Sequence, residues 1–445
     1  MQPATIVVCA GCGHRAHDDD PYPFRCPRAG SDDVDHLMVR ELDPDRVAFP
    51  SEPDEPNPFV RYRELFHAYH LGRRHGLSDA DHVALVRELD ERVGEVEGHG
   101  FAVTPFAPAD ALSGRIGAEV WVKDETGNVS GSHKARHAMG LMTHLLVAER
   151  VDLAPEGTPA DLAIASCGNA ALGAAVIARA AERTLRVFVP TWADPVVLER
   201  LEALGAAIEV CPRREGVPGD PAYQAFREAL RDGLVPFTAQ GPDNGLTVEA
   251  GETLGYEMVS ALRAAGSSLD RLVVQVGGGA LASSLIRAFE DAALLEEPER
   301  LPRIHAVQTE GAHPLERAYR RVRQRVGHEL TPTGILEAMA YARGHRSEFM
   351  WPWEEEPKSV ATGILDDETY DWAAVVAGML ATDGSPIVVS EEMLEEANRL
   401  AREGTGIDVD HTGSAGLAGL LELGRRGEIG ADERVAVLFT GIRRG

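Results

Sequence analysis

The chain has 445 residues, of which 44% are hydrophobic and 26% are charged. Its 44 Lys and Arg residues against 71 Asp and Glu residues give a formal net charge of −27. A surface this negative repels phosphate backbones and anionic lipid headgroups, which excludes nucleic-acid or membrane binding through bulk electrostatics. Any anionic ligand must therefore be bound by hydrogen-bond donors or cations placed locally at its site.

The length leaves room for two domains and a small appendage, at about 100–200 residues per domain. No stretch approaches the ~20 uninterrupted apolar residues that cross a bilayer. Residues 1–10 lack a basic region followed by an apolar one, so we expect a cytoplasmic protein with no membrane partner. Five cysteines are too few, and odd in number, for a disulfide framework.

The first 50 residues form a separate compositional unit, followed by an acidic, proline-rich linker at 51–58. Three of the five cysteines lie in this unit, in a pattern that resembles half of a zinc ribbon. A structural zinc site needs four tetrahedral ligands. The predicted ligands are Cys9, Cys12, Cys26 and His36, with His14 and His17 as alternatives to His36. The competing interpretation is three reduced thiols in a short arm. We expect the unit to stiffen the N-terminus or to contact a neighbour, not to bind nucleic acid.

The rest of the chain changes from helical patterns to an alternating one. Helices are predicted at 62–74 and 80–96, the second with Ser78 as its N-cap. Short apolar runs then alternate with Ala- and Leu-rich stretches. Strands are predicted at 162–165, 185–189, 207–210, 272–276 and 304–308, and helices at 170–182, 195–204 and 281–291. This rhythm predicts an α/β protein with parallel-rich twisted sheets flanked by helices.

Four polar turns mark places where α/β sheets bind ligands, at the carboxyl ends of strands. The first turn leads into Lys134, which is placed where a helix begins. A lysine is a nucleophile when its amine is partly deprotonated, which burial promotes. The alternative is a solvated surface lysine.

The second turn, Ser166 to Asn169, places consecutive backbone N–H groups at a helix start, where a carboxylate can bind. The amide of Asn169 can also hydrogen-bond a phenolic or carbonyl oxygen. The alternative is a loop with a helix cap. Cys167 is expected to be a small packing residue, because no base is placed for it in the sequence.

The third turn is Gly277 to Gly279, after a buried strand. Glycine lets the backbone approach closely and the following helix start favours an anion, so a phosphate can bind here. The alternative is a flexible turn. A nicotinamide dinucleotide site would need an acidic residue at a strand end about 20 residues on, whereas Asp291 falls within a predicted helix.

The fourth turn carries Thr412 and Ser414, whose hydroxyl groups could face a ring nitrogen without placing a full charge beside it. Alone, this turn is typical of a helix cap. Together, a lysine that can form a Schiff base, a carboxylate cradle, a phosphate cup and a neutral hydroxyl match the needs of pyridoxal phosphate.

At these turns the chain resembles the fold type II pyridoxal-phosphate-dependent enzymes (the tryptophan synthase β-like superfamily), and among them it looks most like threonine synthase. The similarity runs from about Asn57 to the C-terminus. The matching segments are 60–65, 104–105, 123–125, 130–134, 166–169, 249–257, 277–279 and the turn with Thr412 and Ser414.

This resemblance implies the roles of individual residues. Lys134 would form the internal aldimine and move the α-proton, and Asn169 would contact the cofactor's O3′. The phosphate would be held by Gly277, Gly278, Gly279, Ala280 and Leu281. Thr412 would face the pyridine nitrogen, with Ser414 as the alternative. The implied substrate-binding residues are Ser166, Cys167, Asn169, Ser130 and Arg136.

Three departures from the family pattern bear on the substrate. His133 precedes the lysine where threonine synthases usually have Phe, Ala135 follows it in place of Asp, and Cys167 replaces Ser or Thr. Only Arg136 is an obvious cation for a phosphate on the substrate.

The resemblance therefore implies a lyase or replacement enzyme, threonine-synthase-like, acting on a small β- or γ-substituted amino acid. The alternatives are a serine/threonine-type dehydratase that yields a 2-oxoacid and ammonia, a β-replacement amino-acid synthase, and a non-catalytic ligand-binding module.

The expected organisation places the cofactor in a cleft between two domains. Residues 1–50 form the Cys-rich segment, 51–135 and 245–445 the large domain, and 136–244 a small mobile domain. Residues 346–370 are expected near the mouth of the cleft, with no chemistry assigned. The resemblance also implies a homodimer.

Overall fold

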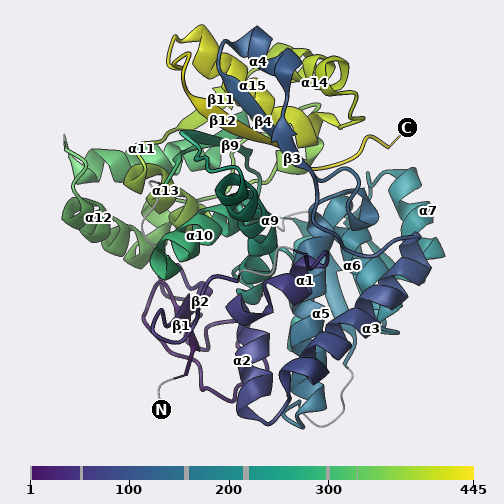
Figure 1. Cartoon of the computed structure of the whole chain (residues 1–445). Helices are drawn as coiled ribbons and strands as arrows, with labels where there is room; N and C mark the ends of the chain where they lie inside the picture. Colours follow the sequence, from purple (N-terminus) through teal and green to yellow (C-terminus); the bar gives the residue numbers. More distant parts are fainter. Residues whose placement is uncertain are drawn as a thin grey trace.

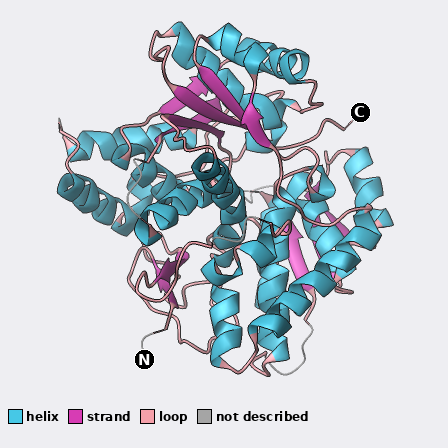
Figure 2. Cartoon of the chain, in the orientation of Figure 1, coloured by secondary structure: helices cyan, strands magenta, loops and turns pink. Residues whose placement is uncertain are grey.

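The computed structural model describes residues 3–50, 54–154, 160–213, 220–296, 301–327 and 329–444. In this part of the chain the strands form three separate sheets (Figure 2). The smallest pairs β1 (Thr5–Cys9) antiparallel with β2 (Met38–Leu42), so that Cys9 lies opposite Met38. It belongs to the N-terminal segment, drawn in purple in Figure 1.

The largest sheet has six strands in the order β11-β10-β9-β12-β4-β3. Its strands are β3 (Phe106–Pro108), β4 (Glu119–Asp124), β9 (Arg271–Gln275), β10 (Arg303–Thr309), β11 (Pro386–Val389) and β12 (Arg434–Phe439). All neighbours are parallel except β3 and β4. Every residue of β9 is buried, as expected for a parallel sheet covered by helices on both faces.

The third sheet is fully parallel, in the order β7-β6-β5-β8. Its strands are β5 (Leu162–Ala165), β6 (Leu185–Pro190), β7 (Ala207–Cys211) and β8 (Val235–Pro236). The α/β class with parallel-rich sheets is therefore confirmed.

Fifteen α-helices surround the sheets in the described ranges. They are α1 (Pro58–Arg61), α2 (His67–Arg74), α3 (Asp79–Glu97), α4 (Asp110–Ile116), α5 (Lys134–Arg150), α6 (Asn169–Ala180), α7 (Pro195–Ala203), α8 (Pro221–Arg231), α9 (Leu246–Ala264), α10 (Ala280–Leu295), α11 (Pro314–Val326), α12 (Pro332–Gly344), α13 (Trp372–Ala381), α14 (Glu391–Thr405) and α15 (His411–Arg425). Helix α5 contacts both α6 and α9, and α9 runs through the middle of the molecule (Figure 1). None of the described helices is both long and apolar enough to cross a membrane.

The predicted helix at 80–96 is confirmed as α3, and Ser78 is its N-cap. The hydroxyl of Ser78 accepts from the N–H of Asp81 at 3.1 Å, and the Asp81 carboxylate accepts from the N–H of Ser78 at 3.2 Å. This reciprocal pair satisfies two donors at the helix start.

The predicted helix at 62–74 is wrong in its first half. The chain forms α1, a short 3-10 turn at Arg63–Leu65 and then α2, because Phe66 adopts an extended conformation between them. Of the expected linker at 51–58, residues 51–53 lie outside the described residues. Its end is ordered by Asn57, which caps α1 by accepting from the N–H of Phe59 at 2.9 Å.

The N-terminal segment is joined to the body of the protein through Arg40 of β2. This side chain is buried and lies against Glu252 of α9 and Asp291 of α10, with its Nη2 atom 2.7 Å from the Asp291 carboxylate. Glu249 lies 3.4 Å from its Nε atom. Asp291 also accepts from the hydroxyl of Tyr256 at 2.7 Å. Because Asp291 is committed to this buried cluster, it cannot serve as the ribose partner of a dinucleotide.

Candidate active site

The loop before Lys134 is held in place by the C-terminal strand segment. The N–H of Ile442 donates to the carbonyl of Gly131 at 2.8 Å, and the N–H of His133 donates to the carbonyl of Thr440 at 3.2 Å. Gly131 has a φ of +66°, and a Cβ there would lie 2.5 Å from Ile442 Cγ2, so only glycine fits. These two backbone hydrogen bonds fix the position at which α5 begins.

Lys134 is the first residue of α5 and is partly exposed. Burial lowers the pKa of its ammonium, and the Asp366 and Asp371 carboxylates nearby oppose that shift. A lowered pKa makes the neutral, nucleophilic amine more available near neutral pH. Lys134 therefore lies at a helix start, as predicted, and the charges of two acids act on its ammonium.

The glycine turn after β9 lies against residues 364–371. A Cβ at Gly277 would lie 2.4 Å from Asp366 Oδ2, and one at Gly278 would lie 2.8 Å from Tyr370 Cδ2. Gly279 caps α10 with a φ of +98°. The turn can therefore be built only from residues without side chains, and its N–H groups, with those of the first turn of α10, lack helical partners.

Asp366 is the acid closest to this turn. Its carboxylate accepts from the N–H of Gly278, while burial raises its pKa to about 6. Asp371 is 1% exposed, and neither carboxylate oxygen has a hydrogen-bond partner among the described residues. Burial, together with the nearby Asp35, raises the pKa of Asp371 to about 8.

Sequence reasoning assigned no chemistry to these two acids. Both lie in or beside the segment 346–370, which was expected near the site. In the sequence, however, Asp366 begins an Asp-Asp-Glu run that is typical of a solvated loop. The glycine turn and the acids are about 90 residues apart, and only the tertiary fold brings them together.

The fourth turn also meets this segment. The hydroxyl of Thr412 accepts from the N–H of Gly363 at 3.0 Å, which leaves its own proton free to donate to a ring nitrogen. Ser414 is fully buried, donates to the carbonyl of Asp410 at 2.9 Å and accepts from the Asn398 amide at 3.0 Å. Because Ser414 is committed inside the protein, Thr412 is the better candidate.

The second turn begins α6, and Gly173 lets this helix approach α5. A Cβ at Gly173 would lie 2.9 Å from the backbone nitrogen of Ala135, the residue after Lys134. The Asn169 side chain accepts from the Arg444 guanidinium through its Oδ1 atom. The hydroxyl of Ser166 accepts from the N–H of Gly168 at 3.4 Å. Burial raises the pKa of the Cys167 thiol, which agrees with its expected role as a packing residue.

Arg136 does not lie where the sequence placed it. It is 1% exposed, and its guanidinium is held by Glu125 at 2.8 Å and Glu257 at 2.6 Å. It also donates to the hydroxyl groups of Thr104 and Thr253 at 3.2 and 3.1 Å. With its donors committed to these four partners, Arg136 is not available to a substrate phosphate, and we leave it out of the proposed site.

Ser130, the remaining substrate-binding candidate, has a φ of 58° and a buried hydroxyl. Its Oγ atom, the Oγ atom of Ser132 and the Nε2 atom of His133 have no hydrogen-bond partner within the described ranges. Ser130 lines a cavity together with Leu172 and Arg444. The unpartnered atoms of Ser132 and His133, directly before Lys134, leave hydrogen-bonding capacity for a polar cofactor bound at that lysine.

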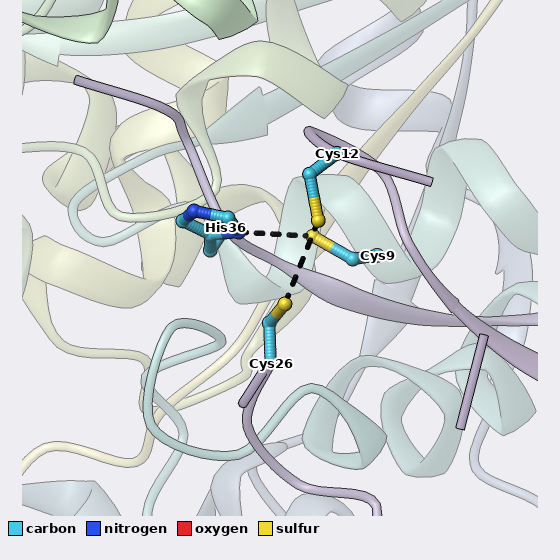
Figure 3. A group of neighbouring side chains, drawn as sticks. All are labelled: Cys9, Cys12, Cys26 and His36. Carbon is cyan, nitrogen blue, oxygen red and sulfur yellow. Dashed lines mark hydrogen bonds between the residues drawn. The ribbon is translucent and has the colours of Figure 1, made fainter. Parts of the chain in front are cut away.

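The cysteines of the N-terminal segment meet in space. Figure 3 shows Cys9, Cys12, Cys26 and His36 pointing toward one another, and their ligand atoms all lie within 4.8 Å of one another. His36 Nδ1 is 3.4 Å from Cys9 Sγ, and its Nε2 is 3.1 Å from Asp32. His36, and neither His14 nor His17, joins the three cysteines in this cluster.

Comparison with known proteins identifies the family and the fold. Residues 99–441 match the model of the family described as pyridoxal-phosphate dependent enzyme. The chain belongs to this family. Its solved relatives include threonine deaminase isoform 2 from Solanum lycopersicum, with a TM-score of 0.59 and 17% identity, covering 82% of this chain and 91% of that one. The fold type II architecture is therefore confirmed.

Two proteins with similar sequences carry different activities in their names. Threonine synthase of Methanocaldococcus jannaschii is 23% identical over 340 residues, which are 76% of this chain and 74% of that protein. A serine dehydratase-like protein of Mus musculus is 31% identical over 228 residues, 51% of this chain and 61% of that protein.

Proposed function

We propose that the protein is a pyridoxal-phosphate-dependent lyase that eliminates the β-hydroxyl group of a small amino acid such as serine or threonine. The observation that favours this activity over threonine synthesis is the position of Arg136. Since its guanidinium is buried between Glu125 and Glu257, it cannot receive a phosphate on the substrate. The charges that raise the pKa of Lys134 belong instead to the acids Asp366 and Asp371.

The proposed roles follow from where the side chains lie. Lys134 binds the cofactor's aldehyde carbon. The N–H groups from Gly277 to Leu281 hold the phosphate, which requires Asp366 to release the N–H of Gly278. Thr412 donates to the ring nitrogen. Asn169 would contact the O3′ oxygen, and the turn from Ser166 to Asn169 would hold the substrate carboxylate.

When bound, pyridoxal phosphate supplies an electron sink for the bond broken at the substrate's Cα atom. The Nζ atom of Lys134 removes the proton from Cα, and the protonated amine can then pass a proton to the leaving hydroxyl oxygen. Elimination needs only this base and a leaving group, whereas replacement also needs a positioned nucleophile. Threonine-synthase-like replacement and β-replacement amino-acid synthesis are thus the competing proposals.

A substrate panel tests this proposal. The purified protein, loaded with pyridoxal phosphate, would be incubated separately with serine, threonine and O-phosphohomoserine, with detection of 2-oxoacids and of threonine. We expect pyruvate from serine or 2-oxobutanoate from threonine. Threonine formed from O-phosphohomoserine, with no 2-oxoacid from the other two, would show that the protein is a synthase instead.

We also propose that Cys9, Cys12, Cys26 and His36 bind one structural zinc ion. Three thiolates and an imidazole make a tetrahedral zinc set of a common kind. Asp32 supports it, because a carboxylate on Nε2 orients the imidazole so that Nδ1 faces the metal.

Metal analysis by mass spectrometry provides the test. We expect one zinc per chain in the purified protein and less than a tenth of that in Cys26→Ser, whose melting temperature should fall because metal binding contributes to folding. His17→Ala, which changes an exposed histidine outside the cluster, should keep its zinc. A wild-type protein without bound zinc would exclude the site.

The remaining expectations stand as proposals. We propose that residues 51–135 with 245–445 form the large domain and that 136–244 form the small one, which is supported by the placement of the four-stranded sheet entirely within 162–236. A homodimer in the cytoplasm, with no nucleic-acid partner, is proposed from the sequence alone.

A further inference from the structure

A cavity of about 250 Å³ lies against α6, where Leu172 and Val176 line it. Helices α3, α6 and α7, the loop before Lys134 and the C-terminal segment surround it. Its apolar wall consists of Leu172, Val176, Val196, Val197 and Leu204. Its polar residues are Glu97, Ser130, Arg200 and Arg444. The cavity is therefore a branched-aliphatic compartment with two cations at its edge.

The two arginines differ in how their charges are matched. Arg200 pairs with Glu97 at 2.9 Å. Arg444 instead donates to two uncharged oxygens, Asn169 Oδ1 and the carbonyl of Ser130. Among the described residues no carboxylate forms an ion pair with it, and partial burial lowers the pKa of its guanidinium. A charge-assisted hydrogen bond to an anion is stronger than one to a neutral oxygen.

A second observation points to a ligand in the same place. Ser130 is 6% exposed, lines the cavity, and its Oγ atom has no partner within the described part of the chain. Buried hydroxyl groups are normally hydrogen-bonded. An acceptor oxygen bound at Arg444 would lie beside Ser130 and could accept from this hydroxyl.

We propose that this cavity binds a small aliphatic carboxylate, with its branched hydrocarbon part against the leucines and valines and its carboxylate on Arg444. Charge decides the headgroup, because the protein as a whole is strongly acidic and repels anions except where a local cation receives them. The apolar wall decides the rest of the ligand, because its five leucine and valine side chains favour a hydrocarbon group.

Binding here would also act on the proposed active site. Arg444 orients the Asn169 amide by donating to its Oδ1 atom, which leaves Nδ2 free to donate to the cofactor's O3′ oxygen in the proposed site. A ligand carboxylate competes for the same guanidinium and weakens this restraint. This coupling rests on the proposed function, whereas the binding itself does not.

The binding test is isothermal titration calorimetry of the purified protein with 4-methylpentanoate. We expect saturable binding that weakens at least about 10-fold in Arg444→Ala. It should be unchanged in Arg443→Ala, a half-exposed neighbour paired with Asp408 at 3.2 Å. It should be lost in Val196→Trp, which fills the cavity from a half-exposed position. The uncharged 4-methylpentan-1-ol should bind at least about 10-fold more weakly than the acid.

Three outcomes would overturn the site: no saturable binding up to about 10 mM, equal loss in both arginine variants, or undiminished binding in Val196→Trp. The coupling has its own measurement. The visible absorbance of the cofactor-loaded protein should shift when 4-methylpentanoate is added, and should not shift in Arg444→Ala. Calorimetric binding without any absorbance shift would support the binding site and disprove its coupling to the active site. The binding measurement does not depend on whether the protein has lyase activity.

Discussion

Lys134→Ala is expected to abolish the visible absorbance that the protein shows with pyridoxal phosphate and to lower the rate of 2-oxoacid formation by about 10²–10⁴-fold or more. The reason is geometric. Lys134 begins α5, and the charges of Asp366 and Asp371 act on its ammonium. In the proposed site its loss removes both the attachment point of the cofactor and the base at the substrate's Cα atom.

The matched control is Lys358→Ala, because that side chain is 80% exposed and forms only a loose pair with Glu356 at 3.7 Å. It should leave both absorbance and rate unchanged. Absorbance scans and a coupled 2-oxoacid assay measure the two effects. If Lys134→Ala kept its rate, Lys134 would not be the catalytic base and the proposed site would be wrong. A wild-type protein that formed no 2-oxoacid would be better described as a binding module that retains the fold.

Glu257→Gln should reduce the free energy of unfolding by about 3–5 kcal/mol, the usual cost of breaking a buried ion pair by removing one partner. Glu257 lies 2.5 Å from Lys123 Nζ and 2.6 Å from Arg136 Nη1, and the side chains of all three are at most 1% exposed. A neutral amide at this position leaves two buried cations to share the carboxylate of Glu125.

Urea denaturation followed by circular dichroism, at a fixed cofactor concentration, measures this loss. Glu403→Gln is the control, since the pair between Arg399 and Glu403 is about as short, at 2.9 Å, but more than half exposed. Its cost should lie within about 1 kcal/mol. An equally small cost for Glu257→Gln would mean that water reaches the buried cluster and relieves it.

The features that the sequence predicted well depend on local chemistry. Ser78 and Asp81 form the cap of α3 from residues three apart, and the run Leu162 to Ala165 forms β5 because a short apolar stretch before a glycine turn has few alternatives in an α/β chain. The N-terminal cluster is a similar case. With three cysteines present, a nearby histidine was the natural fourth member, and the structure selects His36.

The features that the sequence could not provide depend on distant partners. Arg136 looks like any arginine next to an active lysine, and only the approach of Glu257 from α9 shows that its charge is already matched. Asp366 and Asp371 become part of the site because residues 364–371 cover a turn about 90 positions earlier. The break at Phe66 is a third example, since its side chain is as apolar as a helix interior would need.

The position of Arg40 makes the N-terminal segment a structural component of the enzyme. Residues before 99 lie outside the part that matches the family, and a designer might treat them as a removable addition. Yet Arg40 is a buried cation that pairs with three acids of α9 and α10, namely Glu249, Glu252 and Asp291. Exchanging this segment for one without an arginine at this position would therefore leave those acids without the cation of Arg40, unless the acids were changed at the same time.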